Sequence, residues 1–441
     1  MKLHIQSLVY GGAGLGREVD AAETAPPILV PGTLPGEVVT VSPPGRRDGA
    51  AEAELLHVEQ ASPERVSPRC SHFGTCGGCQ LQHASYKEQL QLKTKLLQQM
   101  LLQVGVTDLP PVTQHSAEPW GYRNRIRLQI LNKDSAWSAG YKRRGSEQSL
   151  PITECPIAAP SLWQAMQTLL ALGPQDANAA RWLSASEEVE WFTNAEGDRL
   201  QMTLLVRKSP PRGFAELCQQ LQRELPSLQG AGVLQLPPQR GQSARRWEKT
   251  QPVAAWGASG LNYQVEDRSY WVSRGGFFQV NRYVLPAMLR LVTAGRTGTL
   301  AWDLYAGVGL FSRVLAEQFT TIVAVEGSPI AARDLAAGAR KAAIRTVNAT
   351  TEEFLRGAVL QRDRPELIVM DPPRAGLGAE VCSLLARLGT SQLVYVSCDP
   401  VTLARDVKQL CDSGYSMVEL HLIDMFPQTY HQESMVVLER R

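Results

Sequence analysis

From about residue 261 onward, apolar strand-like segments alternate with helix-like segments, and this alternation constrains the fold more than any other feature of the sequence. TLAWDLYAGVG is a strand that enters a glycine turn, and LFSRVLAEQF is the helix that follows it. Further apolar strands are TIVAVEG, PELIVMDPPRAG, QLVYVSCDP and the closing SMVVLER. Strands and helices that alternate in this way form a mostly parallel sheet with helices on both faces. The sequence therefore predicts a doubly wound α/β domain over residues 261–441.

The segment DLYAGVGLFS has the glycine spacing of a nucleotide-binding turn. Asp303 ends one strand, and Glu326 ends the next at roughly the 20-residue separation of a ribose-binding carboxylate. The dinucleotide fingerprint requires a third glycine or alanine where this chain has Ser312. The turn therefore favours a nucleoside cofactor without a pyrophosphate, such as S-adenosylmethionine, although an ordinary α/β sheet can also contain such a turn.

Two reactive side chains lie at predicted strand ends, at the edge where parallel sheets bind ligands, and a third precedes the last strand. Asp371 in MDPPRAGL would face the junction of cofactor and substrate, unless it only caps the following helix. Cys398 in VSCDP precedes a proline turn, where a nucleophilic thiolate fits, although most lone cysteines are buried and inert. Glu433 precedes the last strand and is either a general base or a surface carboxylate.

Four of the eight cysteines have a spacing that indicates a metal centre. Eight cysteines in 441 residues are too few for a disulfide scaffold. Cys70, Cys76 and Cys79 form a C-x5-C-G-G-C motif, and Cys155 follows far downstream. Three close cysteines and a distant fourth fit an iron–sulfur cluster better than a zinc ribbon, which usually has two C-x-x-C pairs. Independent structural thiols are the alternative.

The region before residue 261 contains shorter elements. Short strands between Gly/Pro turns over residues 1–58 predict a small barrel, with a boundary near SPERVSPRC. Ser85 and Glu88 have capping-box spacing, so we expect a helix over 85–104 that stops at Gly105. Beyond it, residues 110–260 are expected to form an antiparallel sheet with helices, and residues 237–252 a long exposed loop.

The segment GYRNRIRLQI predicts a strand with one basic face. Ile126, Leu128 and Ile130 alternate with Arg123, Arg125 and Arg127. Guanidinium groups on a sheet face can contact RNA phosphates, and the nearby YKRRG adds three more basic residues. The alternative is that carboxylates pair with these arginines.

Together, and in this order, the motifs resemble the RNA (uracil-5-)-methyltransferase family over nearly the whole chain. The resemblance also includes CGGCQLQHASYKEQL, GGFFQVN, VSCDPVTLARD and FPQTYHQESMVVLER. The glycine-rich opening resembles a TRAM domain, an OB-like RNA-binding barrel. Within the family, a chain that combines this domain with four cysteines resembles the branch that acts on bacterial 23S ribosomal RNA. The implied domains are a TRAM barrel at 1–60, a central RNA-binding domain at 61–260 and the methyltransferase domain at 261–441.

The resemblance also implies roles for single residues. A 4Fe–4S cluster would be ligated by Cys70, Cys76, Cys79 and Cys155. The S-adenosylmethionine pocket would be lined by Gln279, Tyr305, Glu326 and Asp371. Cys398 would be the nucleophile and Glu433 the general base, and Phe277 or Phe278 could stack on RNA. Asp399 stands where the family commonly has asparagine, and its negative charge would tend to raise the pKa of the Cys398 thiol.

The implied activity is methylation of carbon 5 of a uridine in 23S ribosomal RNA through a covalent adduct between Cys398 and carbon 6. A transfer-RNA uracil-5 methyltransferase and a non-catalytic RNA-binding or ribosome-assembly protein are the alternatives. Arg374 after Pro373 argues against cytosine-5 and amine methyltransferases, which have a cysteine or an aromatic residue there. The missing third glycine disfavours a nicotinamide-dependent oxidoreductase.

Composition leaves the partner open and favours a cytoplasmic protein. Forty-five basic and 43 acidic residues give a net charge of +2, and the distribution of charge matters more than this sum. No run reaches ~18 apolar residues, and the first residues lack the pattern of a signal peptide. We expect a monomer with an RNA partner and with neither a membrane nor a DNA partner.

Overall fold

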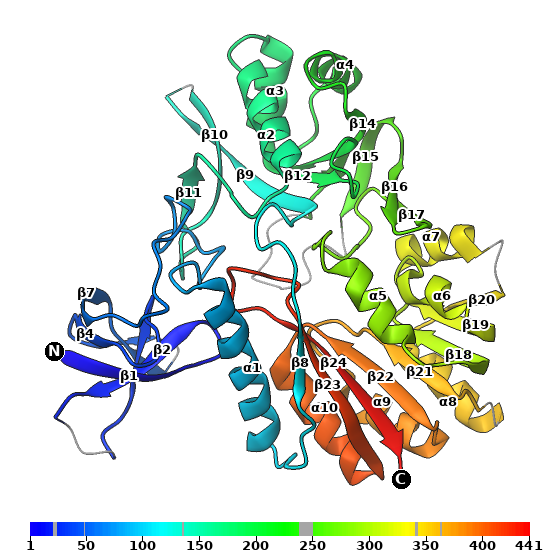
Figure 1. The fold of residues 1–441 in the computed structure, drawn as a ribbon. Coiled ribbons are helices and arrows are strands. Elements are labelled where there is room, and N and C mark those ends of the chain that lie inside the picture. Colours follow the sequence, from blue (N-terminus) through cyan, green and yellow to red (C-terminus); the bar gives the residue numbers. More distant parts are fainter. Residues whose placement is uncertain (21–23, 48, 135, 238–249, 340–342, 362–363) are drawn as a thin grey trace.

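The computed structural model describes residues 1–441 except 21–23, 48, 135, 238–249, 340–342 and 362–363. An N-terminal sheet, a central sheet with its helices and a C-terminal sheet with its helices follow one another (Figure 1). The predicted loop at 237–252 therefore lies almost entirely outside the described residues. Among the helices of the described segments, none has the length and apolar character needed to cross a membrane.

The C-terminal sheet has the order β20-β19-β18-β21-β22-β24-β23-β8. The five strands from β20 to β22 are parallel, and β24 runs antiparallel between β22 and β23. This mixed sheet confirms the predicted α/β class and adds an antiparallel end. Its strands are β18 (Gly298–Leu304), β19 (Phe319–Glu326), β20 (Ile344–Asn348), β21 (Leu367–Met370), β22 (Gln392–Ser397), β23 (Tyr415–Ile423), β24 (Glu433–Arg440) and β8 (Val112–His115).

Helices cover both faces of this sheet because successive strand residues point to opposite sides. Val394 and Val396 of β22 enter one apolar core, whereas Leu393 and Tyr395 enter the other. The near-continuous apolar strands seen in the sequence follow from this burial on both faces. The helices are α5 (Leu285–Thr293), α6 (Leu310–Leu315), α7 (Pro329–Ala339), α8 (Thr351–Gln361), α9 (Gly378–Leu388) and α10 (Pro400–Asp412).

Helix α1 (Tyr86–Gln103) matches the predicted helix to within one residue at each end. Ser85 caps it by accepting a hydrogen bond from the Glu88 backbone N–H at 3.2 Å, and Gly105 follows with φ +86°. The sequence places this segment in the central domain. However, Leu97 and Leu101 pack in the core of the C-terminal sheet, and β8 pairs with β23 as its edge strand.

The central sheet has the order β11-β10-β9-β12-β13-β14-β15, antiparallel except for the β13–β14 pair. Its apolar face packs on three helices around Trp182 and Trp191. The β16–β17 hairpin follows, and its strand β17 packs against α7 before the chain continues to α5. The elements are β9 (Arg125–Lys133), β10 (Ala136–Lys142), β11 (Ser149–Ile152), α2 (Pro160–Leu172), α3 (Ala177–Ala185), β12 (Ser186–Thr193), β13 (Leu200–Val206), α4 (Phe214–Glu224), β14 (Leu228–Gln235), β15 (Gln251–Gly257), β16 (Gly260–Val265) and β17 (Arg268–Ser273).

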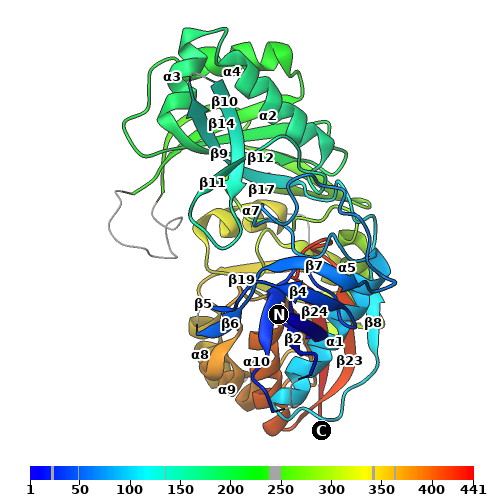
Figure 2. The ribbon, with the colours of Figure 1, turned by 90° about the vertical axis from the view of Figure 1, so that its left-hand side faces the viewer.

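The N-terminal sheet has seven short strands in the order β5-β6-β3-β2-β1-β4-β7. Leu3, Ile5, Val30 and Val39 form its own small apolar core. The sheet lies against the side of the C-terminal region that carries α1 and α10 (Figures 1 and 2). Its strands are β1 (Lys2–Leu8), β2 (Ala13–Glu18), β3 (Ile28–Pro31), β4 (Val38–Val41), β5 (Gly45–Arg47), β6 (Ala50–Glu52) and β7 (Leu55–Gln60).

Candidate active site and cysteine cavity

The candidate catalytic residues meet at one edge of the C-terminal sheet. Asp371 directly follows β21 and Cys398 directly follows β22, so both lie at the carboxyl ends of parallel strands. Strand β24 runs the other way, and Ser397 pairs with Ser434. Glu433, the first residue of β24, therefore lies at the same edge as Cys398. The fold thus brings together three residues that the chain separates by dozens of positions.

The charges at this edge act on one another. Glu433 is buried, and its Oε1 has no hydrogen-bond partner among the described residues. Burial and the Asp371 carboxylate raise the pKa of Glu433 well above its usual value, and Arg374 opposes this shift. Burial, followed by Glu433 and Asp371, raises the pKa of the half-buried Cys398 thiol to about 12, again against Arg374. Without a ligand, the thiol and the Glu433 carboxyl both favour their protonated forms.

Asp371 and a further carboxyl group, that of Asp303, add to this concentration of acidic side chains. Burial and the neighbouring Asp303 raise the pKa of Asp371 to about 7, and a hydrogen bond from Gln279 Nε2 at 3.0 Å partly offsets the shift. Asp303 is fully buried, and burial raises its pKa to about 7 as well. Its Oδ2 accepts a hydrogen bond from Ser312 Oγ at 2.5 Å, whereas its Oδ1 has no hydrogen-bond partner in the described part of the chain. A ligand with a positive charge would stabilise this group of carboxylates.

The predicted cofactor residues surround the glycine turn after β18. Tyr305 has φ +61°, which turns the chain sharply between the strand and Gly307. Glu326 at the end of β19 accepts hydrogen bonds from the Gly307 and Ser328 backbone N–H groups at 2.8 and 2.6 Å. Gln279 lies between β17 and α5, where its backbone carbonyl accepts a hydrogen bond from Asn124 Nδ2. These contacts fix the turn and its carboxylate in place.

Three contributors were missed or misjudged from the sequence. In the sequence, Ser312 is only the position of a missing glycine, yet its hydroxyl binds Asp303. Arg374 indicates only which enzyme classes to exclude, yet its charge acts on both Cys398 and Glu433. Nothing local indicates that Tyr10 reaches Asp399 across the chain. These three roles depend on tertiary contacts, and no signal in the sequence indicates them.

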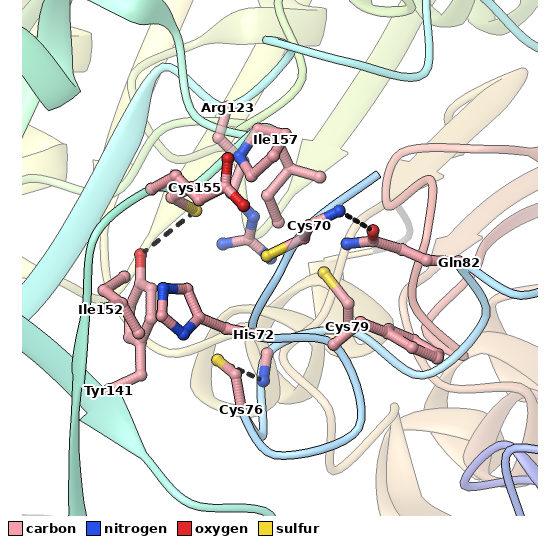
Figure 3. Close-up of a pocket in the computed structure, with 14 residues that line it drawn as sticks. Cys70, His72, Cys76, Cys79, Gln82, Arg123, Tyr141, Ile152, Cys155 and Ile157 are labelled. Carbon is pink, nitrogen blue, oxygen red and sulfur yellow. Dashed lines mark hydrogen bonds between the residues drawn. The ribbon is translucent and has the colours of Figure 1, made fainter. Parts of the chain in front are cut away.

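The four spaced cysteines line one cavity of about 110 Å³, together with His72, Arg123 and Tyr141 (Figure 3). The first three come from the irregular segment before α1, and Cys155 follows β11. Cys70 N–H donates to Gln82 Oε1 at 3.0 Å, and Gly78 N–H to Cys76 Sγ at 3.4 Å. All four are free thiols whose pKa is raised mainly by burial. Within the described residues, no three His, Cys, Asp or Glu side chains are arranged to hold a single metal ion.

The predicted basic face of the arginine strand is instead a paired face. Ile126 and Leu128 are buried as expected. Arg125 and Arg127 both form ion pairs with Glu190 of β12, at 3.1 and 2.5 Å. Arg123 precedes the strand and lines the cysteine cavity, where its Nε has no hydrogen-bond partner. The alternative prediction, that carboxylates pair with these arginines, is therefore correct for Arg125 and Arg127. Their partner Glu190 lies on β12, which is directly beside β9.

Comparison with known proteins finds related RNA methyltransferases. The family model described as tRNA (uracil-5-)-methyltransferase matches residues 85–441. The 23S rRNA (uracil(1939)-C(5))-methyltransferase of Chromohalobacter salexigens is 32% identical, and the alignment covers 99% of this chain and 89% of that protein. The same enzyme of Halomonas elongata gives the same figures. An uncharacterized RNA methyltransferase of Halalkalibacterium halodurans is 29% identical, and the alignment covers 100% of this chain and 96% of that protein.

A solved structure also shares the fold along nearly the whole chain. It is the tRNA (uracil-54, C5)-methyltransferase of Pyrococcus abyssi in complex with S-adenosyl-L-homocysteine. The TM-score is 0.77, and the match covers 99% of this chain and 100% of that one. At 23% sequence identity, this likeness supports the fold alone.

Proposed function

The chain belongs to the tRNA (uracil-5-)-methyltransferase family, and from that membership we propose that it methylates carbon 5 of a uridine in 23S ribosomal RNA. Relatives at about 30% identity over the full length have this activity in their names. The observation that carries the proposal is the placement of Cys398, Glu433 and Asp371 at one sheet edge. A thiol and a carboxyl group at that edge are what a covalent uracil methylation requires.

Cys398 would act first, as the nucleophile. Carbon 5 of uracil is a poor nucleophile, and attack of the Cys398 thiolate on carbon 6 converts the ring to an enolate that is nucleophilic at carbon 5. S-adenosylmethionine supplies the methyl group, carried on a positively charged sulfur. Glu433 would then remove the proton from carbon 5, and the bond between carbon 6 and Cys398 breaks to release the product. The target base must leave any stack to reach these residues.

The cofactor would be held by Gln279, Tyr305, Glu326 and Asp371. A positive charge beside Asp371 would lower the pKa of the surrounding carboxyl groups and of the Cys398 thiol. These changes would favour the thiolate and the carboxylates when the cofactor is in place, which would couple nucleophile formation to cofactor binding. Arg374 already opposes the raised pKa values of Cys398 and Glu433, and the cofactor would add a second positive charge.

The cysteine cavity would hold a 4Fe–4S cluster on Cys70, Cys76, Cys79 and Cys155. The four cysteines line one cavity, and three close cysteines with a distant fourth fit such a cluster better than a zinc ribbon. Arg123 would offset part of the negative charge of four thiolates. Methyl transfer is not a redox reaction, so the role of the cluster would be structural. It would link the segment before α1 to the segment after β11.

The remaining domain roles are proposals of the same kind. The N-terminal sheet, residues 1–60, would be a TRAM barrel that binds RNA. Residues 61–260 would form the central RNA-binding domain, and residues 261–441 the methyltransferase domain. Phe277, 66% exposed beside Gln279, offers a ring for a base, whereas Phe278 is buried in the core. A monomeric enzyme acting on ribosomal RNA would work in the cytoplasm.

The test is methyl transfer from radiolabelled S-adenosylmethionine to unmodified 23S ribosomal RNA and to unmodified transfer RNA, followed by nucleoside analysis. Label in 5-methyluridine from ribosomal RNA alone supports the proposal. Label from transfer RNA instead keeps the reaction and replaces the substrate. Protein that binds S-adenosylmethionine and labels neither RNA, even within ribosomal particles, would count against methyl transfer.

A further inference from the structure

The turn between β1 and β2 of the N-terminal sheet reaches the loop that carries the candidate nucleophile. The Tyr10 hydroxyl donates a hydrogen bond to Asp399 Oδ2 at 3.1 Å. Asp399 directly follows Cys398 and caps α10, where its Oδ1 accepts from the backbone N–H groups of Val401 and Thr402 at 3.0 and 3.1 Å. One carboxylate oxygen is therefore bound to its own helix, and the other to a sheet nearly four hundred residues away in sequence.

Close packing holds Tyr10 in this position. Its ring packs edge-on against Tyr430, with 5.2 Å between the ring centroids. Gly12 has φ +84°, and a Cβ atom there would lie 2.8 Å from the Gln80 Cβ and 3.4 Å from the Tyr430 Cβ. Gln80 in turn donates its backbone N–H to Gln428 O at 3.1 Å. Three segments thus meet around the Tyr10 side chain, and the hydroxyl is directed at Asp399.

We propose that Tyr10 is a positioning residue for the methyl transfer, whose hydrogen bond fixes the Asp399 carboxylate and draws its negative charge away from Cys398. The inference rests on the proposed role of Cys398 as the nucleophile. A carboxylate beside a thiol disfavours the thiolate, and a hydrogen bond donated to that carboxylate weakens this effect. The N-terminal sheet would then contribute to the catalytic loop itself, in addition to any contact with RNA.

Other charged groups face the same thiol and must stay constant in a test. Asp371 and Arg374 come from the loop after β21, and Glu433 from β24. Tyr430, which packs against Tyr10, also packs against His431 with 4.1 Å between ring centroids, and the charge of Asp399 acts on His431. The Coulombic effect of Asp399 on Cys398 is smaller than that of Glu433 or Asp371. The test therefore compares variants of Tyr10 and Asp399 alone.

The experiment is alkylation of Cys398 by iodoacetamide in the full-length protein between about pH 7 and 9, with the rate read from the Cys398 peptide by mass spectrometry. In this range the thiolate is the minor form, so the rate follows the thiolate fraction. In Tyr10→Phe, alkylation is expected to be roughly threefold slower, which corresponds to a pKa about half a unit higher. Asp399→Asn is expected to make it faster. In Asp399→Asn, adding Tyr10→Phe is expected to cause little further change, because no carboxylate charge remains to be screened.

A control variant separates this effect from loosening of the structure. Tyr415→Phe removes a tyrosine hydrogen bond of similar length, 2.9 Å to Thr390 O, at the end of β23 that is farther from Glu433, and is expected to keep the alkylation rate. An unchanged rate in Tyr10→Phe, an equal slowing in the Asp399→Asn background, or the same slowing in Tyr415→Phe overturns the proposal. Because alkylation needs no RNA, these outcomes differ from a failure of the methyl-transfer assay.

Discussion

Lys93 Nζ lies 2.6 Å from Asp424 Oδ1, and both side chains are fully buried. Lys93 comes from α1, and Asp424 follows β23, so the pair joins two segments that are distant in sequence. Lys93 also donates to Phe426 O at 3.0 Å, and the Tyr86 hydroxyl donates to Asp424 Oδ2 at 2.9 Å. Burial lowers the pKa of Lys93, and Asp424 opposes this shift. The network fixes the segment that leads to Glu433.

Removing one partner of this ion pair should be costly. In Lys93→Met, the Asp424 carboxylate stays buried without its cation, and the free energy of unfolding should fall by about 3–5 kcal/mol. Lys95→Met, an exposed neighbour on α1, should change it by less than about 0.5 kcal/mol. Urea unfolding followed by tryptophan fluorescence measures both. Equal stability of the two variants would show that the buried pair contributes little.

The candidate nucleophile can be removed without disturbing ligand binding. Cys398→Ala should bind RNA and S-adenosylmethionine but lose methyl transfer by at least about a thousandfold, because no adduct can form at carbon 6. Cys411→Ala, a half-buried cysteine near the end of α10, is the matched control and should keep the rate. Single-turnover methyl transfer is the measurement. Near-normal turnover of Cys398→Ala would remove it as the nucleophile.

Glu433→Gln should stop the reaction after methyl transfer. Without a base to take the carbon-5 proton, the methylated adduct between Cys398 and RNA should accumulate. Denaturing gel electrophoresis with labelled methyl donor would show protein and label migrating together. Rapid release of free methylated RNA from this variant would mean that another group acts as the base.

Binding of the cofactor should release protons near neutral pH. Asp303 and Asp371 have pKa values raised to about 7, so both are partly protonated there. A positive sulfur nearby lowers those values, and the affinity for S-adenosylmethionine should therefore rise as the pH increases through about 7. Isothermal titration calorimetry in buffers of different ionisation enthalpy counts the protons.

Two comparisons make this proton release specific. S-adenosylhomocysteine lacks the positive charge on sulfur and should release fewer protons. Asp371→Asn should release fewer protons on binding S-adenosylmethionine, because one titrating carboxyl group is gone. If both ligands release the same number in the unmodified protein, the carboxyl groups do not respond to the sulfur charge.

The cysteine cavity gives a prediction that can be seen by eye. Protein purified without oxygen should be brown and contain about four irons per chain. Cys155→Ser should lose most of the iron, whereas Cys411→Ser should keep it. Iron analysis and the visible absorption spectrum check both variants. A colourless protein that contains zinc would refute the cluster assignment.

Signals that act within a few residues predict single helices and strands well. Contacts between segments that are distant in sequence cannot be predicted from it. Helix α1 was recognisable from Ser85 and Gly105, because capping acts within one turn of the helix. The burial of Lys93 on that helix could not be predicted, since its partner Asp424 lies far along the chain. The pairing of Arg125 and Arg127 with Glu190 likewise depends on which strand becomes the neighbour of β9.

The candidate site shows the same division. Parallel strands place their carboxyl ends together, so the meeting of Asp371 and Cys398 followed from the strand–helix alternation alone. That Glu433 joins them depends on the antiparallel insertion of β24, which the apolar pattern of SMVVLER does not specify. Catalytic, cofactor and cluster roles of these residues stay predictions until the variants above are measured.

The edge strand β8 gives this chain an unusual order of assembly. It is synthesised before its partner β23, which follows roughly three hundred residues later, so this edge of the C-terminal sheet can close only after those residues have been made. The central region lies between β8 and β23 in the chain, so it must fold before the C-terminal sheet is complete. A fragment that begins at residue 261 would leave the backbone of β23 unpaired on one side, an open template for association with other chains.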